Sequence, residues 1–322
     1  DLLTILTQID NFMYFPVLII VMAAAGLYFT FTTKGVQIRL AVESVRLILE
    51  PKEDQNSVSS LQAMLVSTAS RVGTGNIIGV STAICLGGPG ACFWMWLMCI
   101  IGASSAFIES TLAQIFKRKD ENGHFYGGPA YYIEKGMGKK WFAVIFAVAA
   151  LLAMLVLMPG VQSNAIAGAV TTGVGLDEWI VGLLIIVLLG VIIIGGVKWI
   201  ANAAQVIVPF MALAYVIVAA IIIFMNFSEL PGVISLIFTS AFGAEELFGG
   251  IIGSAIAWGV KRGIYSNEAG QGTGAHPAAA AEVSHPAKQG LVQAASVYID
   301  TLLICSATAF MILFTGMYNV HD

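Results

Sequence analysis

The chain alternates long apolar runs with short polar segments. Eight runs approach the ~20 residues that an α-helix needs to cross a bilayer, and they cover residues 13–31, 60–86, 91–116, 141–170, 179–197, 203–226, 247–263 and 290–316. They are continuously apolar, whereas a membrane barrel would show segments of ~10 residues with alternating apolar and polar positions. The pattern predicts an all-α polytopic membrane protein with eight spans in one transmembrane domain over residues 1–322.

Composition supports a membrane protein. Hydrophobic residues make up 58% of the chain and charged residues 11%, with a mean hydropathy of +0.88, while a soluble domain carries about 25% charged residues. The four cysteines lie in or beside apolar runs without a CxxC pattern, and the four histidines are scattered over polar segments. We therefore expect packing cysteines, no metal cluster and no organic cofactor.

The lysines and arginines predict the orientation. With the N-terminus outside, the outside segments 1–12, 87–90, 171–178, 227–246 and the tail after Gly316 contain no Lys or Arg. All of these residues except Arg71 fall in the inside segments 32–59, 117–140, 198–202 and 261–288. Basic residues accumulate on the cytoplasmic side of membrane proteins, so both ends of the chain are expected outside.

Residues 67–82, STASRVGTGNIIGVST, place polar groups inside an apolar run. The GNIIG motif is typical of close helix packing. A phosphate-binding glycine loop is the weaker alternative, because the spacing is GxGxxxG and no βαβ unit surrounds it. A broken helix explains more, since packing accounts for the glycines but not for Arg71 and Asn76, which are costly in a membrane. We favour an interruption within residues 72–76, where freed amides would face an anion and freed carbonyls a cation.

Residues 258–275, WGVKRGIYSNEAGQGTGA, carry similar elements at the end of the seventh run. Arg262, Asn267 and Gly270 repeat the spacing of Arg71, Asn76 and Gly79. Interrupted helices in both halves of a transporter point to a midplane substrate site. The alternative is a cytoplasmic loop with turn residues.

Several motifs resemble those of the alanine or glycine:cation symporter family, also called sodium:alanine symporters. They are RVGTGNIIGV, GGPGACFWMW, FYGGPAYYIEKG, MPGVQSNAIA and GVKRGIYSNEAGQGTGAHPAAAAE, and the resemblance runs from about residue 10 to the end. It implies a leucine-transporter-like fold of two five-helix inverted repeats with broken helices 1 and 6. Residues 13–31 would form an extra N-terminal helix, 60–86 helix 1, and 247–263 the start of helix 6.

The resemblance also implies the function and a set of site residues. The expected activity is symport of small neutral amino acids, alanine or glycine, across the plasma membrane by alternating access. Na⁺ is the expected coupling ion, and a proton is the alternative. The partners would be the amino acid and the lipid bilayer, without nucleic acid. The implied substrate residues are Thr74 and Gly75 (amides for the carboxylate), Asn76, Asn164 (amino group), Trp258 and Gly259 (pocket wall), and Ser266 and Asn267; the implied Na⁺ ligands are the carbonyls of Ala69 and Val72.

Two of these assignments have simpler alternatives. Trp258 could equally be an aromatic residue that only packs between helices, and Asn164 could equally form an ordinary interhelical hydrogen bond. The family pattern has three further helices after residue 322, so the C-terminal helices of the second repeat are expected to be missing from this sequence. A transport-incompetent fragment of a symporter is therefore an alternative function. An ion channel is less favoured because no filter loop is present, and neither HExxH nor GxSxG occurs, so we expect no enzyme.

Arg71 is expected to be paired, because a bare guanidinium inside a membrane costs about 2.5–3.5 kcal/mol. It lies about 16 Å into its run by helical rise. Glu109 is predicted as its partner in a structural ion pair, because it lies at a similar depth, and Asp300 is the second candidate.

Overall fold

A computed structural model describes residues 2–51, 57–121, 123–243, 251–316 and 318. It is mostly helical, which confirms the predicted all-α class. The predicted inverted-repeat arrangement of the helices stays a prediction. One antiparallel hairpin pairs β1 (Arg118–Lys119) with β2 (Phe125–Tyr126). The predicted start of the seventh run, 247–250, lies outside the described residues.

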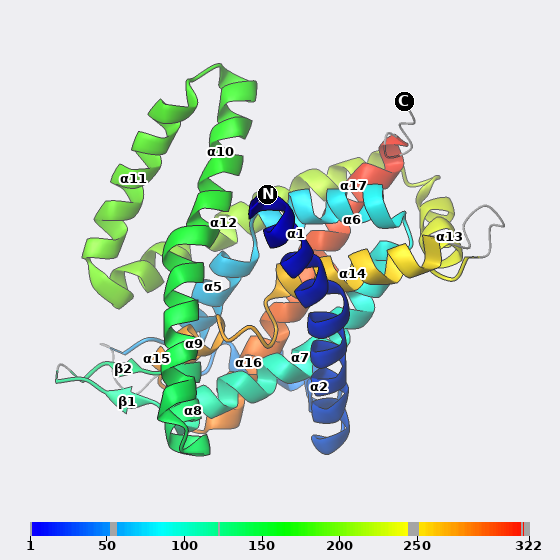
Figure 1. The fold of residues 1–322 in the computed structure, drawn as a ribbon. Coiled ribbons are helices and arrows are strands. Elements are labelled where there is room, and N and C mark those ends of the chain that lie inside the picture. The colour runs from blue at the N-terminus through cyan, green and yellow to red at the C-terminus, as the bar shows by residue number, and fades with distance from the viewer. Residues whose placement is uncertain (1, 52–56, 122, 244–250, 317, 319–322) are drawn as a thin grey trace.

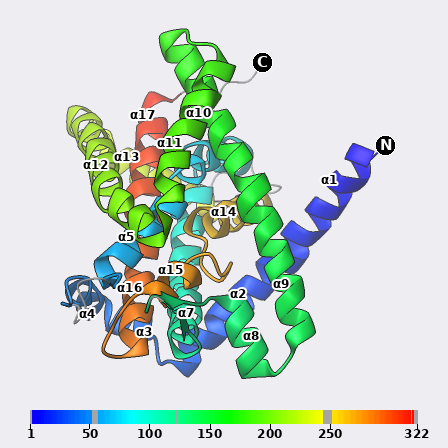
Figure 2. The same cartoon turned by 90° about the vertical axis from the view of Figure 1, so that its left-hand side faces the viewer.

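The helices follow one another with few long loops. Their bounds are α1 Leu2–Phe12, α2 Ile19–Thr32, α3 Val36–Arg39, α4 Ala41–Leu47, α5 Ser60–Arg71, α6 Val80–Gly87, α7 Ala91–Ile115, α8 Pro129–Met137, α9 Lys140–Leu152, α10 Met158–Val174, α11 Glu178–Ile194, α12 Gly196–Met225, α13 Leu230–Ala241, α14 Ile251–Asn267, α15 Ala275–Ala280, α16 Pro286–Tyr298 and α17 Ser306–Thr315. Segments of π-helix are η1 Met13–Leu18, η2 Gly75–Gly79, η3 Ala153–Leu157 and η5 Ile299–Cys305. Several π segments join two α-helices into one rod, as η1 does for α1 and α2 in Figure 2.

Four of the described helical rods are long and apolar enough to cross a membrane: Ala91–Ile115, Lys140–Val174, Gly196–Met225 and Pro286–Thr315. Helices also occupy the other predicted apolar runs, in shorter pieces. Helix α13 falls in a segment predicted as an outside loop, and α3, α4 and α8 fall in segments predicted as inside loops. Proline in the first turn starts both α8 and α13, a position where its missing N–H costs nothing.

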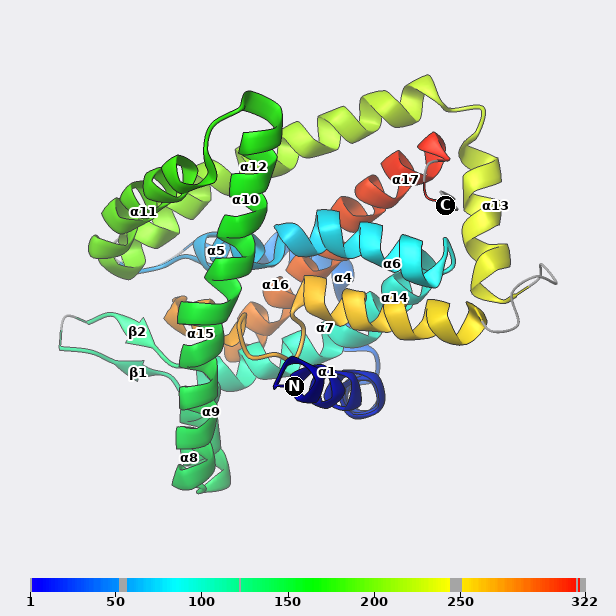
Figure 3. The same ribbon diagram turned by 45° about the horizontal axis from the view of Figure 1, so that its top comes forward.

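Helix α7 is the centre of the packing, between α16 and α14 (Figure 1). Its middle is rich in small side chains, and glycines on the neighbouring helices face it. A methyl group added at Gly263 of α14 would lie 3.3 Å from the Cα of Met95 on α7. Small residues let helix backbones approach closely where the interior lacks a strong hydrophobic drive between helices. Helices α6 and α14 run alongside each other over α7 (Figure 3).

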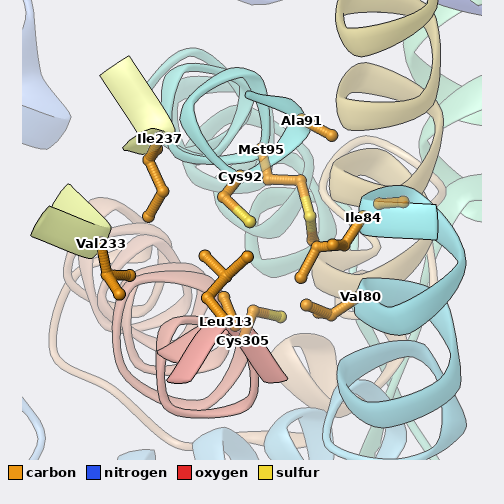
Figure 4. Close-up of a cluster of buried hydrophobic side chains, with 11 residues drawn as sticks. Val80, Ile84, Ala91, Cys92, Met95, Val233, Ile237, Cys305 and Leu313 are labelled. Carbon is orange, nitrogen blue, oxygen red and sulfur yellow. The ribbon is translucent and has the colours of Figure 1, made fainter. Parts of the chain in front are cut away.

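A buried apolar cluster fixes one end of this assembly (Figure 4). It joins α6, α7, α13, η5 and α17 through Val80, Ile84, Ala91, Cys92, Met95, Val233, Ile237, Cys305, Ala309 and Leu313. Cys92, Cys99 and Cys305 are buried free thiols, which confirms the packing role expected for them, while Cys85 is exposed.

The hairpin of α10 and α11 extends beyond the helices that surround α7 (Figure 1). The side chains of α11 are almost all apolar, and most residues of the hairpin are exposed, including Val174, Leu183 and Ile194. Such an apolar surface suits contact with lipid hydrocarbon or with further protein, not with water.

Lys261 and Arg262 are not in a loop, contrary to the prediction. They lie inside α14, about 9 Å before its last residue by helical rise. Aromatic rings cover them: the Lys261 ammonium lies 4.3 Å from the ring centre of Tyr14, and the Arg262 guanidinium 5.4 Å from that of Trp258. Cation–π contact of this kind offsets part of the cost of burying charge.

A polar contact near the start of α16 ties it to the segment after α4. Lys288 donates to Glu50 at 2.6 Å, and Ser284 donates to the same oxygen at 2.7 Å. Partial burial raises the pKa of Glu50, but the hydrogen bonds from Lys288 and Ser284 outweigh it, so the net shift is downward. The carboxylate therefore stays ionised and holds α16 in place.

Candidate functional site

The first predicted interruption is confirmed. Helix α5 ends at Arg71, and Val72 is extended with ψ of 99°. The amide of Gly73 donates to the side-chain oxygen of Asn76 at 2.8 Å, and the amide of Asn76 donates to the Gly73 carbonyl at 3.2 Å. The chain then resumes as η2. Asn76 thus acts as a local cap for the broken helix, which explains a fully buried asparagine at this point.

This turn takes helical donors away from two carbonyl groups. In a continuous α-helix the amide of Gly73 would serve the carbonyl of Ala69, and the amide of Asn76 that of Val72. Both amides have other acceptors here. The carbonyls of Ala69 and Val72 are the two predicted as cation ligands, and both lose the i+4 amide that would otherwise satisfy them.

The amide of Thr74, predicted to hold a carboxylate, has a side-chain acceptor. It donates to the Oε1 atom of Gln162 on α10 at 3.2 Å. Gly73 makes room for this contact, because a methyl group there would lie 2.9 Å from the Gln162 amide. A primary amide oxygen and a carboxylate oxygen both accept a hydrogen bond from a backbone N–H, so the Thr74 amide faces a hydrogen-bond acceptor here.

The structure does not bring Asn164 to this place. It is exposed on α10, two residues after Gln162 and therefore turned about 200° around the helix. Gln162 is the residue of α10 that reaches the break, although sequence reasoning assigned the site role to Asn164. Both residues lie in the motif MPGVQSNAIA. Their different directions around the helix axis of α10 decide that Gln162, and not Asn164, reaches the break.

The second stretch is also interrupted. Helix α14 ends at Asn267, Glu268 and Gly270 have positive φ of 52° and 84°, and α15 begins at Ala275. The segment is no surface loop, since Asn267, Glu268 and Ala269 are all buried. Both Glu268 carboxylate oxygens accept from the Ser70 hydroxyl, at 3.0 and 2.9 Å. The two interruptions therefore contact each other directly.

They also meet at Gly75. A methyl group added there would lie 3.2 Å from the Cα of Ser266, so glycine lets η2 and α14 touch. Beside it the Asn76 amide nitrogen donates to the Ser266 hydroxyl at 3.1 Å and to a carboxylate oxygen of Asp300 at 2.6 Å. Asn267 lies next to this group, with its amide 3.5 Å from the Thr301 hydroxyl. Ser266 thus contacts the first break, whereas the hydrogen bonds of Asn267 go to Thr301 and to Ala269. Their implied role beneath a substrate pocket stays a prediction.

Gly259 faces α7 and not a pocket. A methyl group there would lie 2.5 Å from the Ala91 carbonyl oxygen and 2.6 Å from the Cβ of Trp94. Trp258 is half-buried on α14, and its Cβ lies against Gly87 at the end of α6. In this structure Gly259 therefore has a packing role in place of the implied role in the pocket wall. For Trp258, both a pocket wall and simple packing remain open as interpretations.

We expect Gly259→Val to destabilise the protein by about 2–3 kcal/mol, because overpacking against backbone forces α14 away from α7. Thermal unfolding of the detergent-purified protein measures this. Gly253→Val on the same helix is the control, since nothing lies within 4 Å of its added methyl group. Equal losses in both variants would contradict the packing role.

The predicted Arg71–Glu109 ion pair is not formed. Arg71 is 2% exposed, and its Nη1 donates to Gln293 at 3.4 Å and to Ser296, both on α16. One Glu109 oxygen accepts from the Gly272 amide at 2.9 Å, and the other has no partner among the described residues. The second break separates the two side chains, because Arg71 packs against Gly274 of that segment.

The sequence was compared with known proteins. A family model described as "Sodium:alanine symporter family" matches residues 1–322. The chain belongs to the sodium:alanine symporter family. Among its relatives, the putative sodium/proton-dependent alanine carrier YrbD of Bacillus subtilis is 63% identical, over 94% of this chain and 62% of that protein. The sodium/proton-dependent alanine carrier of Bacillus sp. strain PS3 is 51% identical, over 86% and 62%.

A third relative, the probable sodium/glutamine symporter GlnT of Bacillus subtilis, is 48% identical over 96% of this chain and 65% of its own length. The chain thus spans a little under two thirds of these relatives. Membership of a symporter family confirms that the chain is a multi-pass membrane protein and not an enzyme.

Proposed function

We propose that the protein carries small neutral amino acids, alanine or glycine, across the plasma membrane together with Na⁺. The single observation that carries this proposal is the contact between two interrupted, buried helices at Gly75 and Ser266. Broken helices in a transporter mark its midplane binding site. We place these helices as helices 1 and 6 of a leucine-transporter-like core with an extra N-terminal helix, and the N-terminus outside.

The substrate carboxylate is proposed to bind at the amides of Thr74 and Gly75. Supporting this, the Thr74 amide is held by the Gln162 side chain, an uncharged analogue of a carboxylate. A substrate would take the place of Gln162 at this amide. Glycine at position 75 lets Ser266 of α14 lie close to the backbone, so a carboxylate bound there would lie beside both interrupted helices.

The carbonyls of Ala69 and Val72 are proposed to hold Na⁺. Hard cations prefer oxygen ligands, and both carbonyls have lost their helical donors. Two relatives are named sodium/proton-dependent, so a proton is the alternative coupling ion. Cation and amino acid would stabilise the same bent segment, and each would raise the affinity for the other by an equal factor.

We therefore expect alanine affinity to fall about tenfold or more when sodium is replaced by choline at constant ionic strength, a factor within the usual range for coupled ligands. Isothermal titration calorimetry of the reconstituted protein with alanine measures it. Glycine and glutamine are titrated in parallel, because one relative is named for glutamine.

The control is leucine, which lies outside the proposed class of small neutral amino acids. Unchanged alanine affinity in choline would reject sodium coupling. Absence of binding by each amino acid in sodium would reject the proposed substrate class, and conductance without saturation would favour a channel.

A further inference from the structure

Asp300 lies where the two interrupted helices meet a third irregular element. It belongs to η5, the π-helical segment between α16 and α17, and it is fully buried. Its carboxylate contacts Asn76 of η2 and Ser266 of α14. Among the buried carboxylates of the described residues, Glu268 belongs to the second interruption and binds Ser70, and Glu109 binds Gly272, whereas Asp300 contacts η2 and α14 from a third element. A change of charge at Asp300 therefore reaches both halves of the proposed binding site.

The groups around Asp300 are neutral. One oxygen accepts from the Asn76 amide at 2.6 Å; the other accepts from the hydroxyls of Ser266, at 3.0 Å, and Thr301, at 2.9 Å. Among the ion pairs of the described residues, none involves Asp300. A buried carboxylate without a direct cation is expensive to keep ionised.

The surrounding charges do not balance it either. The buried charged side chains of the described residues are Arg71, Glu109, Glu268 and Asp300, which sets one cation against three carboxylates. The titratable groups that act on Asp300 or its immediate surroundings are Arg71 from α5, Cys99 from α7, Cys305 of its own segment and Tyr215 from α12. Of these only Arg71 is cationic, and its hydrogen bonds go to α16.

The hydrogen-bond geometry favours a proton over a metal ion at this place. The Asn76 amide nitrogen already lies within 3.5 Å of Asp300, the Ser266 hydroxyl and the Cys305 sulfur, so it occupies the space a cation would need. A protonated carboxyl needs no such space. It donates to a hydroxyl of Ser266 or Thr301, because hydroxyls both donate and accept.

We propose that Asp300 is the proton-binding site of this carrier and that its protonation promotes substrate binding. The proton passes from bulk water to a carboxylate oxygen, and the charge at Asp300 changes from −1 to zero. The inference rests on the proposed function, in which a substrate carboxylate binds at Thr74 and Gly75, next to Asn76. Two carboxylates so close repel each other in a medium of low polarity. Neutral Asp300 removes that repulsion, so proton and substrate raise each other's affinity.

The test is the pH dependence of alanine affinity in Asp300→Asn, measured by calorimetry at constant sodium. Asparagine has the shape and charge of the protonated acid. The native protein is expected to lose about tenfold in affinity from acidic to alkaline pH, whereas Asp300→Asn keeps its acidic-pH affinity throughout. Glu109→Gln is the matched control, a buried carboxylate whose replacement keeps an acceptor for Gly272, and it is expected to retain the native pH dependence.

A second measurement keeps the proposal testable without substrate. Infrared difference spectra between alkaline and acidic pH should show the stretching band of a protonated carboxyl in the native protein and its loss in Asp300→Asn. If that band persists in Asp300→Asn, or if this variant keeps the native pH dependence, the proton site is wrong. Should no amino acid bind while the band behaves as expected, the proposed substrate class fails and the proton site stands.

Discussion

Replacing Gly75 with leucine is expected to abolish alanine binding while leaving the protein in the membrane. The added side chain would start 3.2 Å from the Cα of Ser266, at the contact between η2 and α14. Overpacking of this kind costs about 1–3 kcal/mol of folding stability. The same side chain would also cover the amides proposed for the substrate carboxylate. Calorimetric titration with alanine measures the loss, and size-exclusion chromatography in detergent confirms that the variant is folded.

A graded pair of variants identifies the cause. Gly75→Ala is expected to weaken binding less than leucine does, because only one methyl group meets α14. Gly79→Ala in the same π-helical segment is expected to bind as the native protein does, since its methyl group would have only the Arg262 Cδ atom at 3.8 Å and the Thr74 carbonyl at 3.9 Å nearby. Equal effects at positions 75 and 79 would show that helix flexibility, not the contact with Ser266, is responsible.

The sequence predicts most of the helices because apolar runs near 20 residues have few alternatives to membrane helices. It places some boundaries wrongly where polar groups find local partners. Lys261 and Arg262 end an apolar run in the sequence, yet α14 continues through them because Tyr14 and Trp258 cover their charges. Helix α13 was missed because a short helix that starts at a proline looks like a loop with turn residues.

The interruption at residues 72–76 is predictable because glycines and a buried asparagine are unfavourable in a continuous membrane helix. The direction of a side chain is harder to predict. Asn164 and Gln162 are two residues apart, and only the rotation of α10 decides which of them meets Thr74. Likewise, equal depth suggested that Arg71 pairs with Glu109, but depth says nothing of the segment that packs between them.

Arg71→Met is expected to lower the free energy of unfolding by about 3 kcal/mol or more, because removal of one member of a buried charged group leaves the others uncompensated. Arg71 is the only cation among the buried charged side chains of the described residues, and it hydrogen-bonds to Gln293 and Ser296. Its loss would leave three buried carboxylates and no buried cation among the described residues. Thermal unfolding of the purified protein in detergent measures the effect. Arg118→Met is the control, since Arg118 and Glu134 form a partly exposed pair worth less than about 1 kcal/mol.

The double variant Arg71→Met with Glu109→Gln separates charge from contact. Since the two side chains do not touch, a loss of direct hydrogen bonds would make their effects additive. The alternative is that the net charge of the buried charged side chains determines stability. Neutral glutamine at position 109 then relieves part of the repulsion that Arg71→Met creates. The double variant would be more stable than the sum of the two single losses predicts. We expect this second result, by about 1 kcal/mol of coupling. Additive losses, or an Arg71→Met variant as stable as Arg118→Met, would show that Arg71 serves α16 packing alone and has no part in balancing the buried carboxylates.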